Sequence, residues 1–120
     1  MTIKIPGLNV ENGLDLFDGD TELYLIVLRS FAANTPTVLE KLRSVSAETL
    51  AAYSATVHGL KGTSMSIGAD DIGQTAKRLE ALSKAGDLAG VQALNESFLK
   101  QVGILVKEIQ AWLEKNASES

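Results

Sequence analysis

The chain has 120 residues, a formal net charge of −4 at pH 7 and no cysteine. This length suits one domain with a single core, and the lack of cysteine excludes disulfides and thiolate metal sites. The single histidine excludes a multi-histidine metal site, and the acidic balance argues against a general nucleic-acid binder. Because there is no N-terminal signal pattern and no apolar run of about 20 residues, we expect a cytoplasmic protein that spans no membrane.

The N-terminal third predicts a short helix followed by a long one. Asn9 can cap a helix that runs through Phe17, and the pair Gly19-Asp20 then ends it and starts the next helix. Pro36 lies inside the second segment, so we expect a kink there. The apolar stripe predicted to face the core of this helix consists of Leu23, Ile26, Val27, Phe31, Val38, Leu42 and Val45.

The next segment predicts a helix that starts at the cap Ser46 and runs to about Ile67. Gly68 supplies the turn that follows, and Asp70 is expected to cap the next helix. The residues of the first of these two helices that recur at helical spacing and should be buried are Leu50, Tyr53, Val57, Leu60 and Ile67.

The C-terminal part predicts two further helices. The first has Ile72, Ala76, Leu79 and Leu82 on its inward face and ends at Gly86, after which Asp87 starts the last and longest helix. The last helix has apolar residues at alternating three- and four-residue steps, which is typical of a bundle seam: Val91, Leu94, Phe98, Val102, Leu105, Ile109 and Trp112. The polar residues 116–120 are expected to fray.

Together these elements predict an all-α fold. We expect one domain, residues 1–120, that forms an antiparallel up-down-up-down four-helix bundle with a short N-terminal capping helix. Three glycines inside predicted helices, Gly73, Gly90 and Gly103, have no explanation in the sequence pattern.

The single histidine is the most informative residue. Counted along an α-helix, His58 lies roughly 130° from the centre of the buried stripe, so it should face solvent. Lys61 and Gly62 follow three and four residues later and share its face. The other residues of this face are small or flexible, and we expect them to form a smooth partner-docking surface: Ala51, Ser54, Ala55 and Met65.

Glu80 is a candidate partner for the imidazole. In an antiparallel helix pair that turns near Gly68, His58 and Glu80 both lie about 15 Å from the turn. The carboxylate is then placed to accept a hydrogen bond from Nδ1–H, which leaves Nε2 as the nucleophile. A glutamate that only faces solvent fits the spacing equally well.

The segment His58-Gly59-Leu60-Lys61-Gly62-Thr63-Ser64, followed by Gly68-Ala69, resembles the signature of the histidine-containing phosphotransfer (HPt) domain. The resemblance covers nearly the whole chain. It implies that His58 is the phosphoacceptor, Lys61 the nearby cation and Gly62 the clearance residue. By the same resemblance Glu80 matches an acidic position that orients the ring, where other members have glutamine, and Lys84 matches a second basic position.

The resemblance implies a phosphorelay intermediate that exchanges a phosphoryl group with receiver aspartates and with a sensor histidine kinase. The chain is expected to be a monomeric carrier with no kinase or ATPase activity and no metal or cofactor, since Mg²⁺ belongs to the receiver. Lys61 is expected to offset part of the phosphoryl charge. Three residues of the first helix are expected to extend the docking surface, although some of them must pack on the core: Leu14, Leu16 and Phe17.

Three alternatives are considered beside the phosphorelay carrier. One is a scaffold that docks receivers without accepting phosphate, and another is one module cut from a larger hybrid sensor kinase. The third, a metal- or ligand-binding bundle, requires inward-facing Glu and His residues. The nearly apolar inward stripes argue against that third reading.

Overall fold

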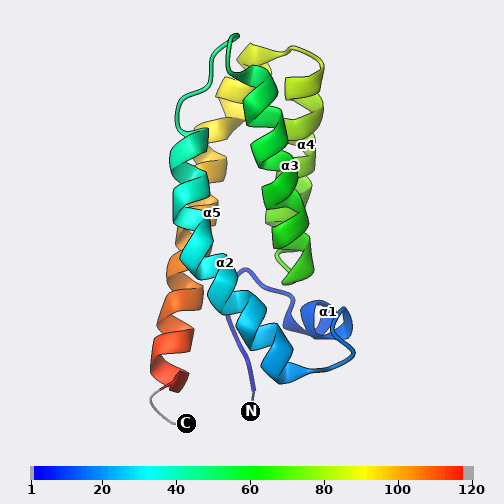
Figure 1. Cartoon of the computed structure of the whole chain (residues 1–120), viewed down its shortest axis with the longest axis vertical. Coiled ribbons are helices and arrows are strands. Elements are labelled where there is room, and N and C mark those ends of the chain that lie inside the picture. The colour runs from blue at the N-terminus through cyan, green and yellow to red at the C-terminus, as the bar shows by residue number, and fades with distance from the viewer. Residues whose placement is uncertain (1, 118–120) are drawn as a thin grey trace.

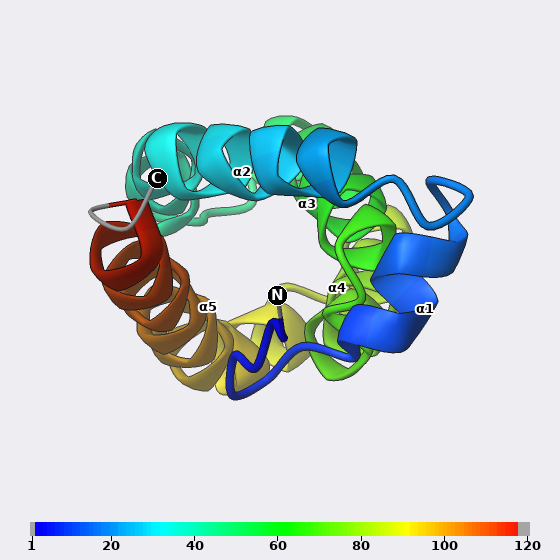
Figure 2. The same cartoon turned by 90° about the horizontal axis from the view of Figure 1, so that it is seen from below.

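The computed structural model describes residues 2–117, in which the regular structure is helical (Figure 1). The helices are α1 (Val10–Asp15), α2 (Thr21–Leu42), α3 (Leu50–Ser66), α4 (Asp70–Lys84) and α5 (Leu88–Ala117). The four longer helices surround a common axis in the end-on view, with α1 to one side (Figure 2). Helix α2 contacts α3 and α5, and α4 contacts the same two helices. The prediction of an all-helical chain is confirmed.

Helix α1 packs on the turn between α3 and α4. Gly68 adopts a left-handed backbone with φ of 84°. Its carbonyl oxygen accepts a hydrogen bond from the backbone N–H of Asn9 at 2.8 Å. A Cβ atom on Gly68 would collide with the carbonyl oxygen of Asn9, so only glycine allows this approach. The hydroxyl of Tyr24 in α2 also donates to this turn, at the carbonyl oxygen of Ile67 over 2.8 Å.

The predicted inward stripe of α2 is wrong at its N-terminal end. Leu23 and Ile26 are 42% and 57% exposed, whereas Tyr24 and Leu28 are fully buried. Tyr24, Leu28 and Phe31 form the buried side of this part of the helix, and the buried phenol of Tyr24 has the carbonyl oxygen of Ile67 as its hydrogen-bond partner. Apolar spacing alone gave no means of choosing between the two faces.

The predicted bounds of α2 also need correction. The helix continues through Pro36, where a kink is predicted, and it ends at Leu42, before Val45, the last residue of the predicted stripe. Val45 lies half-buried in the connection to α3 and packs against the core. The first helix is likewise shorter than predicted, because α1 ends at Asp15 and not at Phe17.

Two of the predicted helix caps are replaced by other residues. Ser46 and Thr49 exchange backbone-to-side-chain hydrogen bonds of 2.9 and 3.3 Å, which form a turn before α3, and the regular helix begins at Leu50. The cap of α4 is Ala69, so Asp70 is already the first helical residue. Asp87, expected to start the last helix, directly precedes its first residue Leu88, and its Oδ1 accepts from the backbone N–H of Gly90 at 2.9 Å.

Packing explains two of the three unassigned glycines. A Cβ atom on Gly73 would lie 2.7 Å from Sδ of Met65, and one on Gly90 would lie 2.6 Å from the carboxylate of Asp87. Each position therefore leaves room for a neighbouring side chain. The tail predicted to fray from Asn116 is helical to Ala117, and Asn116 Nδ2 donates to the carbonyl oxygen of Trp112 at 2.7 Å. The rest of that tail, 118–120, lies outside the described residues.

Candidate functional site

His58 stands on the outer face of α3, as expected. The neighbouring Val57 is fully buried, and its place in the core fixes the rotation of the helix. The side chain of His58 is 62% exposed. The imidazole is thus accessible to another protein while its helix is held firmly by the core.

Glu80 of α4 lies directly beside the imidazole, so the equally open alternative of a solvent-facing glutamate is excluded. Nδ1 of His58 is 2.7 Å from Oε2 of Glu80. The Glu80 side chain is only 8% exposed. Because α3 and α4 are joined by the short turn at Gly68, residues at similar distances from the turn meet across the pair.

Two lysines complete the cluster around this carboxylate. Nζ of Lys61 lies 2.8 Å from Oε1 of Glu80, and Nζ of Lys84 lies 3.0 Å from Oε2. The Lys61 side chain is 26% exposed, whereas that of Lys84 is 67% exposed. The sequence had suggested Lys84 only by resemblance, and the structure places it in the same group as Lys61 and His58.

These contacts keep Glu80 ionised. Hydrogen bonds from Lys61 above all, then from Lys84 and His58, lower the pKa of Glu80 from 4.5 to about 2 despite its burial. A carboxylate in this state only accepts hydrogen bonds. The contact with His58 therefore favours the tautomer with the proton on Nδ1, which leaves the lone pair on Nε2.

The structure divides the residues expected to form the docking surface. Ala51 and Ala55 are exposed, and Met65 is half-buried where it packs over Gly73. Ser54 is only 8% exposed, so its expected place on this surface is wrong. The helix turns Ser54 toward the core, one residue after the buried Tyr53.

Gly62 has open space around it. A Cβ atom there would meet nothing within 4 Å, and the same holds for Gly59 beside His58. The surface next to the imidazole is therefore free of side chains at two positions. A partner backbone can come close to the ring at these points.

The residues of the first helix region separate into exposed and packed ones. Leu16 is 64% exposed, whereas Leu14 and Phe17 are half-buried and pack on the core. Phe17 lies against Tyr24 with ring centroids 6.2 Å apart. The exposed residues Leu23 and Ile26, which the sequence pattern had assigned to the core, add apolar surface on the adjacent α2.

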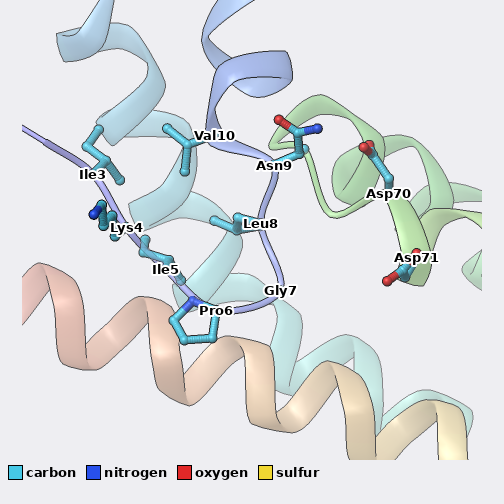
Figure 3. A pocket seen from close by; sticks show the side chains of 11 residues that line it. Ile3, Lys4, Ile5, Pro6, Gly7, Leu8, Asn9, Val10, Asp70 and Asp71 are labelled. Carbon is cyan, nitrogen blue, oxygen red and sulfur yellow. The ribbon is translucent and has the colours of Figure 1, made fainter.

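A separate hollow of about 900 Å³ lies at the N-terminal segment (Figure 3). The segment from Ile3 to Val10 lines it together with Asp70 and Asp71 at the start of α4. None of the residues that contact Glu80 lines this hollow. It is therefore distinct from the histidine cluster.

Within residues 2–117, no group of His, Asp and Glu residues has the arrangement of a metal site. In the same part of the chain, no helix has the length and the apolar character needed to cross a membrane.

Comparison with known families identifies the bundle. The model of the Hpt domain family matches residues 26–116, a range that contains α3, α4 and every member of the histidine cluster. The chain belongs to the Hpt domain family. No curated protein and no solved structure matched the chain.

Membership in the Hpt family places the chain in two-component signalling, where such domains take part in phosphotransfer. Hpt domains act as phosphocarriers, generally without enzyme activity of their own, and interact with receiver domains and kinases. The family match confirms the resemblance found in the sequence. The match assigns no role to individual residues. Their roles are inferred from the geometry described above.

Proposed function

We propose that Nε2 of His58 accepts a phosphoryl group from a receiver aspartate or a kinase and passes it to a receiver aspartate. One observation carries the proposal: an exposed imidazole has its Nδ1 2.7 Å from a buried carboxylate. This contact directs Nδ1–H inward and Nε2 outward. The up-down-up-down order of the four long helices, with α1 as the cap, is part of the same proposal.

The transfer itself needs one bond to form and one to break. The lone pair of Nε2 attacks the phosphorus of the aspartyl phosphate, an N–P bond forms, and the P–O bond to the aspartate breaks. The aspartate leaves as a carboxylate, and the imidazole ring, which keeps its Nδ1 proton, becomes positively charged. The negative charge of Glu80, whose Oε2 lies 2.7 Å from Nδ1, stabilises this new positive charge. The reverse transfer follows the same path.

The lysines supply positive charge for the phosphoryl oxygens. Glu80 carries one negative charge and faces both Lys61 and Lys84, so the cluster has one excess positive charge before the phosphoryl group arrives. That excess favours a dianionic group on the neighbouring ring. Because Lys84 is exposed, water screens its contribution, and Lys61 is the more effective cation.

The partner is proposed to dock over α3 and the adjacent part of α2. Ala51 and Ala55 give this surface low relief, and a groove of about 400 Å³ between α2 and α3 reaches Gly59 beside the histidine. Exposed apolar side chains extend it toward α1: Leu16, Leu23 and Ile26. A surface of this kind fits a transient contact that must release after transfer. We propose that the chain acts as a monomer without a cofactor, and that the receiver supplies Mg²⁺.

Incubation with a receiver that carries labelled aspartyl phosphate tests the proposal. The wild-type chain should take up label that is acid-labile and base-stable, as expected of phosphohistidine. The variant His58→Gln should take up none while circular dichroism shows unchanged helix content. Label on the variant would refute the assignment. Receiver binding without any label on the wild-type chain would favour the scaffold instead.

A further inference from the structure

A second groove lies between the C-terminal end of α2 and helix α5. Its volume is about 1090 Å³, and its apolar lining includes Leu39, Leu99 and Ile104. The histidine cluster joins α3 to α4, whereas this groove follows the seam of α2 and α5 on the other side of the helix ring (Figure 2). The two surfaces can therefore be occupied at the same time.

The floor of the groove is unusually open for the middle of a long helix. Ile104 is 53% exposed although it is a large apolar residue. The adjacent Gly103 would meet nothing within 4 Å if it carried a Cβ atom, and it does not have a left-handed backbone. No turn and no neighbour within the described chain requires glycine there, unlike at Gly73 and Gly90. Gly103 thus leaves a notch beside the exposed side chain of Ile104, and the backbone of another protein can come close at this point.

The charged residues of the groove have the opposite sign to the chain as a whole. Arg43, Lys100 and Lys107 line it against the single carboxylate of Glu96, while the whole chain carries −4. Arg43 forms an exposed ion pair with Glu40 at 3.2 Å. Within the part of the chain that the structure describes, Lys100 and Lys107 have no ion pair. These two lysines leave the rim positive.

We propose that this groove binds an acidic amphipathic helix of a partner protein. The lining of α5 extends from Gln92 to Lys107, a length of about 22 Å that matches a helix of about 15 residues. Such a helix would place its apolar face over Ile104 and Gly103 and its carboxylates beside Lys100 and Lys107. A two-fold contact between copies of the chain would bring like-charged rims together, which disfavours a dimer. The proposal does not depend on the chemistry of His58.

A designed peptide provides the probe. It has about 15 residues, leucine at helical three- and four-residue steps and glutamate on both flanks. We would titrate it into the 120-residue chain labelled with ¹⁵N. The expected result is saturable binding with shifts at Lys100, Gly103, Ile104 and Lys107, and weaker binding when salt rises from roughly 0.1 to 0.5 M.

Two variants and a matched control sharpen the assignment. The double change Lys100→Glu with Lys107→Glu should weaken peptide binding by about tenfold or more. Gly103→Leu should do the same by filling the notch. Arg29→Glu with Arg78→Glu makes the same change in net charge at exposed positions outside the groove, and it should leave binding nearly unchanged.

Other outcomes would overturn the proposal. Shifts centred elsewhere, absence of saturable binding, or an equal loss in the control would show that the groove does not recognise an acidic helix. A concentration-dependent dimer in sedimentation, abolished by Gly103→Leu, would assign the groove to a second copy. Phosphoryl uptake is measured separately, and the groove variants should take up label as wild type does. If wild type took up no label, the role of His58 would be refuted and the peptide result would still stand.

Discussion

The bundle contains two polar clusters that differ in their charge and in their access to solvent. At the α3–α4 seam, the buried Glu80 contacts three ionisable side chains that reach solvent: His58, Lys61 and Lys84. Near the N-terminal end of α3, the hydroxyl of Tyr53 donates to Oδ1 of Asn95 at 2.8 Å. Nδ2 of Asn95 in turn donates to the carbonyl oxygen of Leu42 at 2.8 Å.

The Tyr53 cluster is closed and neutral. Both side chains are buried, and burial raises the pKa of Tyr53 to about 12, which keeps the phenol protonated as a donor. Its hydrogen bonds join α3, α5 and the end of α2, where Leu42 presents a carbonyl that the helix leaves unpaired. Each donor has its acceptor inside the protein. The cluster fixes how three helices meet.

The Glu80 cluster is open and charged. Its carboxylate contacts His58, Lys61 and Lys84, whose side chains all reach solvent. The two lysines together carry more positive charge than Glu80 carries negative charge. A network that served only packing would gain nothing from an excess of exposed cations. This contrast supports the proposed role of the Glu80 cluster in phosphotransfer, whereas the Tyr53 cluster completes its hydrogen bonds within the core.

The largest effect is expected from Glu80→Ala. Without the carboxylate, the Nδ1 proton and the charge on the phosphorylated ring lose their partner, so transfer should slow by about 10- to 100-fold. Glu80→Gln should retain most of the rate because the amide oxygen still accepts from Nδ1–H. Single-turnover transfer from a phosphorylated receiver gives the rates, and ¹⁵N chemical shifts of the ring report the tautomer. A tautomer unchanged in the alanine variant would contradict this role.

Tyr53→Phe tests the closed cluster. The change leaves Oδ1 of Asn95 buried without its donor and should lower the free energy of unfolding by about 1–3 kcal/mol. Urea unfolding gives the value. The transfer rate of the same variant should stay within about twofold of wild type, because the contacts of Glu80 are untouched. A matching loss of transfer would mean that the two clusters are coupled.

The lysines should differ in their effect on transfer. Lys61→Ala removes the more buried cation and should slow transfer by about five- to tenfold. Lys84→Ala removes an exposed one and should slow it by less than about threefold. Lys77→Ala, at an exposed position of α4 without an ion pair to Glu80, is the control. Equal effects of the first two changes would show that exposure does not rank them.

The smallest effect concerns acid stability. The pKa of Glu80 is lowered to about 2 in the folded chain from 4.5, so its ion pairs stabilise the fold above pH 4.5. That stabilisation should be lost as the pH falls from 4.5 toward 2. As the pH falls over this range, the unfolding temperature should decrease more steeply in wild type than in Glu80→Gln. Parallel curves would show that Glu80 adds nothing to stability.

Much of the site was predicted because helical spacing is a local property. The buried stripe through Val57 faces His58 outward, and the turn at Gly68 brings Glu80 to the same height. Both inferences need only the helix repeat and one glycine. The convergence of Lys61 and Lys84 on one carboxylate was not predicted, because it depends on side-chain directions across two helices.

The errors concern residues whose neighbours come from distant parts of the chain. Leu23 and Ile26 have the spacing of a core face, yet Tyr24 faces inward, where its hydroxyl donates to the carbonyl oxygen of Ile67. Ser54 looks like a surface residue and is buried. Local spacing gives a helix its repeat, whereas the faces of neighbouring helices decide its rotation.

The sequence by itself determined the helical class, the exposed histidine and the family, because these depend on periodicity and on a contiguous motif. Only the tertiary structure decided which face of α2 is buried, which cations surround Glu80, and that a basic groove follows the seam of α2 and α5. The physical reason is that burial and electrostatic contacts form between side chains far apart in the chain, and no local pattern records them.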